Sequence, residues 1–207
     1  TGNLESLVRG FGLDVHVAHL DIILPIGISF YTFQSLTYTI DIYRRKLAPT
    51  ANLKEYALCV AFFPKLLAGP IERAANLLPQ IAQEREMKLG QFASGLKLIL
   101  FGLFKKVVIA DGVANVVRQA FGTPNSLSWI DALVGTFFFA VEIYCDFAGY
   151  SDVAIGTAKL FGIDLMKNFN FPYFARNPSE FWARWHISLS SWFRDYVFFP
   201  LGGPYGS

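Results

Sequence analysis

Apolar residues along this chain gather in four stretches, separated by short segments that carry charges, proline or glycine. The first of them holds no charge and has the length of about 20 residues that a helix needs to cross a bilayer. This pattern predicts an all-α, polytopic membrane protein with spanning helices and broken or re-entrant segments. The four stretches cover residues 22–40, 57–71, 89–119 and 127–160.

The first stretch is more polar than a helix that faces only lipid. Hydroxyl and amide groups are costly against lipid, so they should face protein or a water-filled cavity. Gln34, the amide among them, is therefore a candidate for lining such a cavity. The polar members of the stretch are Ser29, Thr32, Gln34, Ser35, Thr37 and Thr39.

Prolines interrupt the second stretch. Proline removes a backbone donor and disfavours helix for the residue before it, so Pro64, Gly69 and Pro70 predict a broken segment. Basic residues lie on both sides, Lys54 before and Arg73 after, which favours a segment that enters and leaves the membrane on the cytoplasmic side. A simple interhelix loop with some apolar content remains the alternative.

The third stretch contains three lysines, Lys97, Lys105 and Lys106, which leave only a short clean apolar run. We expect a tilted or partly shielded helix whose lysines extend their amines to the membrane surface.

Two carboxylates in the fourth stretch, Glu142 and Asp146, lie one helical turn apart and share a face. A charged residue at bilayer depth is by default a functional candidate, and we place Tyr150 and Asp152 in the same group. The alternative is an acid at the water interface or an ion pair. The cations considered for such a pair are Lys159, Arg184 and Arg194.

A tryptophan-rich segment near the end of the chain predicts one amphipathic helix. Asn177 is suited to cap it, Pro178 is tolerated in the first turn, and Glu180 follows the cap by three residues. At helical spacing one broad face is aromatic and apolar. That face comprises Phe181, Trp182, Trp185, Leu189, Trp192, Phe193 and Tyr196.

A polar row follows the edge of this face. On a continuous helix His186, Ser190 and Arg194 would form an i, i+4, i+8 row about 12 Å long. An imidazole, a hydroxyl and a permanent cation beside aromatic rings are suited to binding or activating a polar group in a dry place. An interfacial helix with tryptophan and arginine anchors is the alternative.

Composition supports membrane insertion and excludes other classes. Hydrophobic residues make up 53% and charged residues 16% of the 207, whereas soluble domains are about 25% charged. A net charge of +2 is too small for a nucleic-acid surface, so no nucleic-acid partner is expected. Cys59 and Cys145 are predicted to be buried free thiols. No metal site is expected, because His16 and His19 have no third ligand nearby.

Four motifs in order resemble the membrane-bound O-acyltransferase family, with the greatest likeness to its bacterial branch that O-acetylates alginate and related exopolysaccharides. The D-alanyl transfer protein of teichoic acid is a more distant likeness. Residues 20–203 carry the resemblance. The motifs are LPIGISFYTFQ at 24–34, FPKLLAGPI at 63–71, YCDFAGYSD at 144–152 and WHIS at 185–188.

The resemblance implies a many-helix fold around a funnel through a thin membrane centre, in a multi-pass protein of the bacterial inner membrane. It implies no bound cofactor. The acyl donor would be a cytoplasmic thioester, acyl-CoA (acetyl-CoA) or an acyl carrier, and the acceptor an extracytoplasmic polysaccharide hydroxyl, reached directly or through a periplasmic acyltransferase partner. A non-catalytic scaffold of the same fold stays open, as does a transporter, which should show an internal repeat.

The resemblance also assigns site residues. His186 matches the first polar position of the family's active site, in a supporting role, and Arg194 matches the arginine that follows it. The second position, a histidine nearer the C-terminus, has no counterpart here, so residues 1–207 are expected to be an inactive internal fragment of the domain, truncated at both ends. The candidates for lining the funnel are Gln34, Glu142, Asp146, Tyr150, Asp152, Trp185 and Ser190.

Overall fold

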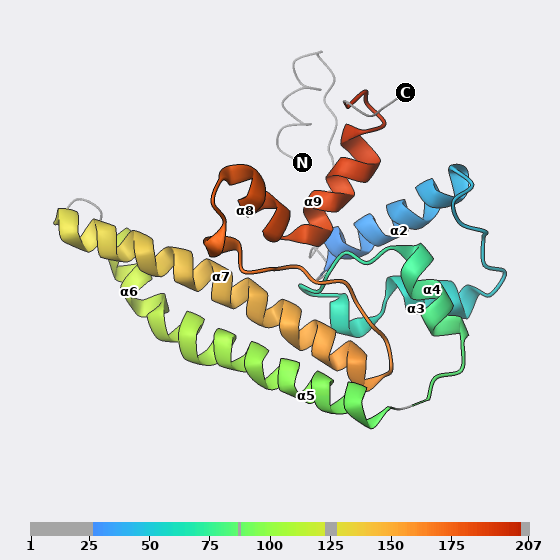
Figure 1. Cartoon of the computed structure of the whole chain (residues 1–207), viewed down its shortest axis with the longest axis horizontal. Helices are drawn as coiled ribbons and strands as arrows, with labels where there is room; N and C mark the ends of the chain where they lie inside the picture. Colours follow the sequence, from blue (N-terminus) through green and yellow to red (C-terminus); the bar gives the residue numbers. More distant parts are fainter. Residues whose placement is uncertain (1–26, 87, 123–127, 204–207) are drawn as a thin grey trace, which may run out of the picture.

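The structure, a computed structural model, describes residues 27–86, 88–122 and 128–203. Over these residues it is helical and has no strand, which confirms the predicted all-α class (Figure 1). The first half contains α2 (Ile28–Tyr43), α3 (Leu53–Val60), η1 (Phe63–Lys65), α4 (Ala74–Ala82), α5 (Leu89–Leu103), η2 (Phe104–Ala110) and α6 (Asp111–Gly122). The second half contains α7 (Trp129–Leu160), η4 (Pro172–Phe174), α8 (Pro178–Arg184), α9 (Ile187–Phe193) and η5 (Arg194–Phe198).

The helix α7 is the predicted fourth stretch, 32 residues long and about 48 Å from end to end at 1.5 Å per residue. Ser128 caps it, because its hydroxyl accepts from the Asp131 N–H while the Asp131 carboxylate accepts from the Ser128 N–H. Of the helices described, α7 alone combines the length and apolar content that a membrane crossing requires.

A long antiparallel pair dominates the fold: α5 and α6, joined by the π-helical turn η2, run alongside α7 (Figure 1). Glycines make this contact close. A Cβ on Gly102 would lie 2.6 Å from the carbonyl oxygen of Gly149, and one on Gly156 would lie 2.6 Å from that of Gly95. Within each helix the two glycines are seven residues apart, so they repeat on one face, and the two backbones touch at both levels.

The third stretch is helical as predicted, and Lys97 is exposed, but Lys105 and Lys106 are not extended to a surface. Lys105 pairs with Asp152 of α7, 2.7 Å from Nζ to Oδ2, and Lys106 contacts Asp146 at 2.6 Å and Asp111 at 2.8 Å. Ion pairs across the helix contact replace the expected snorkelling because acids of α7 lie within reach of the amines.

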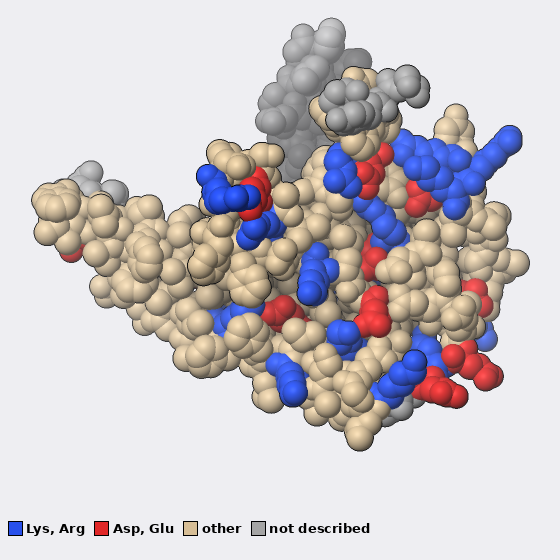
Figure 2. Space-filling model, viewed as in Figure 1, with Lys and Arg blue, Asp and Glu red and all other residues tan. Residues whose placement is uncertain are grey.

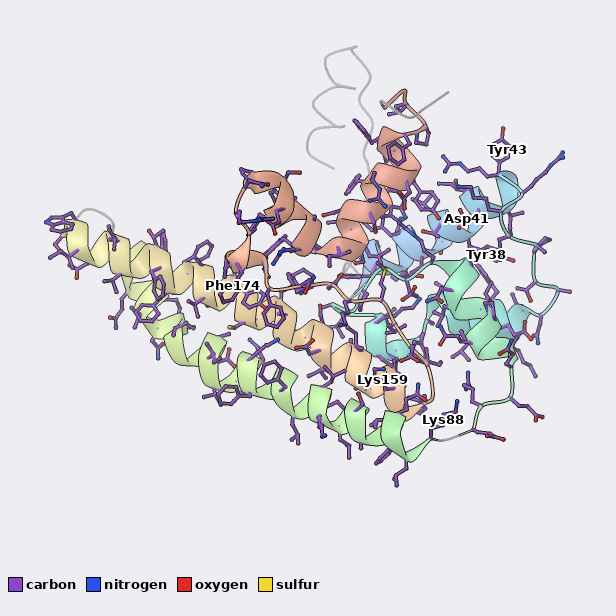
Figure 3. The ribbon with its side chains drawn as sticks, viewed as in Figure 1. Tyr38, Asp41, Tyr43, Lys88, Lys159 and Phe174 are labelled. Atoms are coloured by element: carbon purple, nitrogen blue, oxygen red, sulfur yellow. The ribbon has the colours of Figure 1, made fainter. Side chains whose placement is uncertain are left out.

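The helix α2 differs from the predicted span of 22–40, of which residues 22–26 lie outside the described residues. It begins after Gly27, whose φ of 81° favours glycine, and continues to Tyr43. Asp41, the charged residue that directly follows the predicted span, is inside the helix and only 5% exposed. The reason is Tyr196 of η5, whose hydroxyl donates to the Asp41 carboxylate at 2.8 Å; Figure 3 shows Asp41 and the neighbouring residues of α2.

The second stretch is broken, as predicted. The helix α3 ends at Val60, the short 3₁₀ turn η1 contains Pro64, and α4 begins only at Ala74. Here α3 and α4 pack against the C-terminal end of α7 and the residues that follow it. The buried core of this part is formed by Cys59, Phe62, Ala74, Leu77, Leu78, Ile81, Ile155, Ala158, Ile163 and Leu165.

The re-entrant path of this segment remains a prediction that labelling can test. Single cysteines at the exposed positions Asn52 and Asn76, in a full-length protein with Cys59 and Cys145 replaced by alanine, should react with an impermeant maleimide from the same side of the membrane. A single cysteine at the exposed position Asn115 of α6 is the control that shows whether the maleimide is reactive. Reaction of Asn52→Cys and Asn76→Cys from opposite sides would exclude a segment that returns.

Charged side chains are unevenly placed. On the face that Figure 2 shows, Lys, Arg, Asp and Glu lie over most of the molecule, the part that holds α2, α4 and α9 included, whereas the outer end of the α6–α7 pair is almost entirely uncharged. The exposed surface of that pair carries large apolar side chains, among them Phe137, Phe139 and Ile143 of α7. Such a surface is typical of a protein that meets lipid or further protein there.

Candidate functional site

The tryptophan-rich segment is two helices, not the single helix predicted. The cap is as expected, with the Asn177 side chain accepting from the Glu180 N–H at 2.8 Å. After α8, however, Trp185 is extended and His186 has a φ of 43° and a ψ of 54°, before α9 begins. The left-handed conformation is uncommon for a residue other than glycine, and such strained residues cluster at functional sites.

Competing hydrogen bonds explain the break. In a continuous helix the carbonyl of Arg184 would accept from Ser188, but here it accepts from the Asn170 N–H at 3.0 Å. The N–H groups of Ile187 and Ser188 bond instead to the main-chain and side-chain oxygens of Asn168, at 2.9 and 3.3 Å. The segment that follows α7 therefore supplies hydrogen-bond partners to the backbone groups that a continuous helix would pair with one another.

The imidazole of His186 is half-buried against an aromatic ring of α7. Its ring meets the ring of Phe147 of α7 edge to face, with centroids 4.6 Å apart, and its Nε2 atom is buried without a hydrogen-bond partner among the described residues. Burial lowers the pKa of His186 to about 4. The imidazole is therefore neutral at pH 7, with a free ring nitrogen.

The predicted polar row is wrong in its geometry, since His186 precedes α9 rather than lying within one long helix. Ser190 stays close through its main chain, whose N–H donates to the His186 carbonyl at 3.0 Å. Arg194 is different: its side chain is 58% exposed, and its Nε lies 2.9 Å from the Asp195 carboxylate. Its expected pairing with Glu142 or Asp146 does not occur.

An aromatic wall flanks His186, built by α7, α8 and the connection between them rather than by one helix face. Trp185 stacks on Phe181 with centroids 5.5 Å apart and meets Phe169 edge to face at 5.1 Å. Phe169 in turn contacts Phe147, the ring against His186. Trp185 thus belongs to the surroundings of the imidazole, as predicted.

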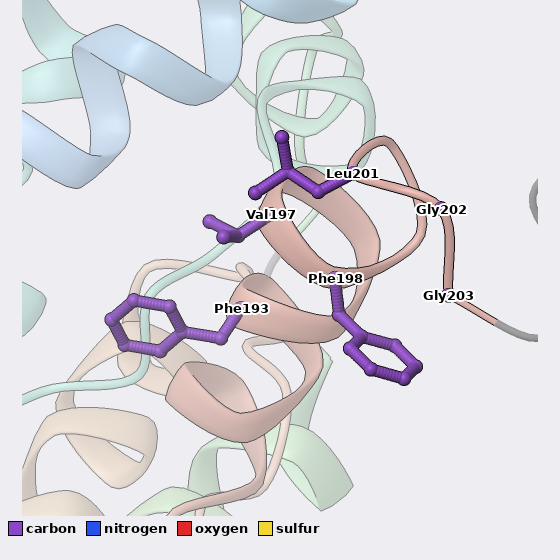
Figure 4. A pocket seen from close by; sticks show the side chains of 6 residues that line it. All are labelled: Phe193, Val197, Phe198, Leu201, Gly202 and Gly203. Atoms are coloured by element: carbon purple, nitrogen blue, oxygen red, sulfur yellow. The ribbon is translucent and has the colours of Figure 1, made fainter.

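The rest of the predicted aromatic face packs elsewhere. Trp192 of α9 stacks on Tyr196 and donates from its indole N–H to the Thr37 hydroxyl of α2 at 2.8 Å. Beyond it, an apolar cavity of about 390 Å³ lies against η5, lined by Phe193, Val197, Phe198, Leu201, Gly202 and Gly203 (Figure 4).

Asn168 is the residue that the sequence analysis missed. It is 1% exposed, its Oδ1 accepts from the Ser188 hydroxyl at 2.6 Å, and its Nδ2 donates to the Ser151 hydroxyl of α7 at 3.1 Å. Asn168 therefore fastens the start of α9, and with it the turn at His186, to α7. Nothing in the local pattern of residues 167–170 distinguishes this asparagine from a loop residue.

Substitution of Asn168 should loosen this attachment. Asn168→Ala leaves the two serines without their buried partner, which costs about 1–3 kcal/mol for an unsatisfied group, so the full-length protein should melt at a clearly lower temperature in detergent. The matched variant Asn170→Ala changes an exposed side chain and should leave the melting temperature nearly unchanged. Equal melting temperatures for both variants would show that the hydrogen bonds of Asn168 do not stabilise the attachment of α9 to α7.

Two acids of α7 are paired, but with other cations than those predicted. Asp146 and Asp152 contact Lys106 and Lys105, whereas Lys159 pairs with Asp164, Arg184 with Glu180, and Arg194 with Asp195. The carboxylate of Glu142 has no such partner among the described residues. The ion-pair interpretation is thus confirmed for Asp146 and Asp152, and the named partners are wrong.

Two further funnel candidates lie in other surroundings. Gln34 is 4% exposed on α2, and Tyr150 is 43% exposed on α7 with the Lys106 amine 5.6 Å from its ring centroid. Their role in a funnel stays a prediction.

The part of the chain that the structure describes gives little support for a metal site or a reactive thiol. It contains no group of three His, Cys, Asp or Glu side chains that could hold an ion. The pair His16 and His19 lies outside the described residues. Cys59 and Cys145 are buried free thiols, as predicted.

Comparison with known proteins gives consistent matches. The sequence model of the membrane-bound O-acyltransferase family matches residues 27–207. A Pseudomonas aeruginosa protein named "Probable alginate O-acetylase AlgI" is 43% identical over 205 residues, which cover 99% of this chain and 39% of that protein. A Helicobacter pylori peptidoglycan O-acetyltransferase is 38% identical, over 91% of this chain and 41% of the relative.

A more distant relative, the teichoic acid D-alanyltransferase of Bacillus subtilis, is 30% identical over 88% of this chain and 47% of its own length. The chain thus spans about 40% of the length of the alginate and peptidoglycan relatives that it matches.

Proposed function

Because the chain belongs to the membrane-bound O-acyltransferase family, we propose that the whole protein transfers an acyl group, acetyl in the first instance, from a cytoplasmic thioester to hydroxyls of an extracytoplasmic polysaccharide or cell-wall polymer. Relatives named for alginate and peptidoglycan O-acetylation support this acceptor class. The proposal includes a multi-pass protein of the bacterial inner membrane, and transfer that is direct or passes through a periplasmic acyltransferase partner.

The observation that carries the proposal is the setting of His186. A neutral imidazole with a free, buried nitrogen stands at a strained turn beside an aromatic wall, and the hydrogen bonds of Asn168 to Ser188 and to Ser151 of α7 hold this turn in place. Because this nitrogen is buried, a hydrogen bond that it donates to a developing oxyanion is stronger than it would be in water.

The chemistry requires a base and an oriented carbonyl. The acceptor hydroxyl attacks the thioester carbonyl carbon, its proton passes to a base, and the carbon–sulfur bond breaks to release the thiol. A positioned imidazole base contributes about 10²–10⁴-fold. We assign the base to a histidine outside residues 1–207, His186 to orienting the acyl carbonyl or the acceptor, and Arg194, exposed beside Asp195, to an anionic group of the substrate.

The direct test uses inverted membrane vesicles from cells that make the full-length protein, with polymer inside. Labelled acetyl-CoA is added outside, where the cytoplasmic face now lies, and label in the polymer is counted. Vesicles without the protein are the control. Label in polymer above the control supports the acyltransferase; free labelled donor inside, with none on polymer, would establish a transporter, and no label at all would favour the scaffold.

A further inference from the structure

Two adjacent charged residues, Glu72 and Arg73, lie between the broken second stretch and the start of α4. Glu72 is 2% exposed, and the side chain of Arg73 is 19% exposed. Charged groups are costly to bury unless they are paired and hydrogen-bonded, so the partners of these two residues indicate what they do. None of the chemistry assigned above uses either of them.

The carboxylate of Glu72 binds three N–H groups. Its Oε2 accepts from the main-chain N–H of Met166 at 2.7 Å. Its Oε1 accepts from the side chain of Asn76 at 2.9 Å and from the N–H of Arg73 at 3.2 Å. Hydrogen bonds to an ionised acceptor are about twice as strong as neutral ones. Glu72 therefore attaches the segment that follows α7 firmly to the start of α4.

This segment is the one that breaks the tryptophan-rich helix at His186. Met166 precedes Asn168 by two residues, and Asn168 accepts from the two N–H groups that directly follow His186. The attachment at Glu72 thus lies only two residues from the side chain that shapes the turn.

Arg73 contacts the chain on the other side of the turn. Its Nη2 lies 3.0 Å from the carboxylate of Asp195 in η5 and 3.4 Å from the hydroxyl of Ser191 in α9. Its guanidinium also lies over the ring of Tyr196, 4.8 Å from the centroid. Because α9 is only seven residues long, a contact at Ser191 also restricts its first residues, which follow His186.

We propose that Glu72 and Arg73 are positioning residues that fix the imidazole of His186 from both sides. Glu72 holds the segment that breaks the helix, and Arg73 holds the helix that starts after the turn. Since the two residues are adjacent, one short piece of backbone sets both attachments. A displacement of about 1 Å at a reacting group costs on the order of 10²-fold in rate. The effect on rate rests on the proposed function, whereas the effect on the position of the ring does not.

Kinetics in the vesicle assay separate positioning from stability. Glu72→Gln puts an amide N–H where an oxygen accepts, so it should lower the rate per folded molecule about tenfold and leave the KM for acetyl-CoA unchanged. Arg73→Lys keeps the charge but loses the planar fork of donors, and should lower the rate severalfold.

The matched control is Gln80→Ala. Gln80 of α4 also binds the segment that follows α7, through the N–H and the carbonyl of Asp164 at 2.8 and 3.0 Å, but farther along the chain from Asn168. It should lower the melting temperature and leave the rate per folded molecule near that of wild type.

A double-mutant cycle with His186→Gly gives a readout that a purely structural role would not produce. If Glu72 acts through the imidazole, Glu72→Gln lowers the rate in wild type and costs nothing further in His186→Gly. Losses that multiply in the double variant would overturn the proposal, because Glu72 would then act independently of the ring.

Chemical modification tests the position of the ring without acyl transfer. Diethyl pyrocarbonate reacts with unprotonated imidazole nitrogens, and peptide mass spectrometry of the full-length protein in detergent gives the modification rate at His186. That rate should rise severalfold in Glu72→Gln and Arg73→Lys, because the buried Nε2 becomes accessible, and stay unchanged in Gln80→Ala. Wild-type modification rates in both positioning variants would overturn the proposal. Faster modification together with no acetyl transfer by the wild-type protein would support the positioning and refute the proposed function alone.

Discussion

Replacing His186 with glycine in the full-length protein should lower polymer O-acylation by about 100-fold or more, the effect of removing one hydrogen-bond donor to a developing oxyanion. The amount of folded protein in the membrane should stay close to that of wild type. Both quantities are measured in the same membranes, acyl groups on the polymer by chemical release and protein by size-exclusion of the tagged chain.

Glycine is chosen because of the backbone. At a φ of 43° an alanine would be strained, whereas glycine adopts the left-handed region readily. His186→Gly therefore removes the imidazole and its donor without disturbing the turn. In the glycine variant the space left beside Phe147 should accept free imidazole, so added imidazole should restore part of the activity.

The control is Trp182→Phe, a change at a 58% exposed side chain of α8 that keeps an aromatic ring. It should retain nearly full activity. If His186→Gly also acylates polymer at the wild-type rate, the imidazole takes no part in the reaction, and the left-handed turn only determines the path of the chain.

Elements that depend on interactions between residues close in sequence were predicted well. The length of α7, the interruption at Pro64 and the cap at Asn177 all follow from local hydrogen bonding and backbone restrictions, and the structure has each of them. The four motifs that resemble the acyltransferase family also led to the correct family.

The break at His186 was not predictable in the same way. The aromatic spacing continues through Trp185 without a change of period, so the local pattern favours one helix. What ends α8 is a set of hydrogen bonds that Asn168 accepts and Asn170 donates, and the approach of these two residues depends on how the chain returns after α7. The polar row failed for this reason.

Ion pairs were missed for a related reason. Lys105 and Asp152 are 47 residues apart, and only the antiparallel contact of α5 with α7 brings them together. A lysine in an apolar stretch predicts snorkelling when its helix is considered alone. The glycines that allow the contact are visible in the sequence, but their partners are not.

The closeness of α5 and α7 leads to a second large effect. In Gly102→Ala the new methyl group would lie 2.6 Å from the Gly149 carbonyl oxygen, and in Gly149→Ala it would lie 2.7 Å from that of Gly102. Both obstacles are backbone atoms, so the helices must separate. We expect each substitution to destabilise the full-length protein by about 1–3 kcal/mol, as overpacking does, and the leucine variants to give little folded protein.

Gly112→Ala is the matched control, because Gly112 is also helical, in α6, and a Cβ there meets nothing within 4 Å. Alanine in place of a helical glycine that has space is stabilising by about 0.5–1 kcal/mol. Thermal unfolding in detergent should therefore shift downward for Gly102→Ala and Gly149→Ala and upward or not at all for Gly112→Ala. A downward shift of equal size in all three would mean that the substitutions act through general helix or membrane effects. A downward shift for Gly102→Ala and Gly149→Ala together with an upward shift for Gly112→Ala would show that direct backbone contact between α5 and α7 stabilises the fold. The same contact keeps Asp146 and Asp152 of α7 within reach of Lys106 and Lys105, because separated helices cannot form those ion pairs.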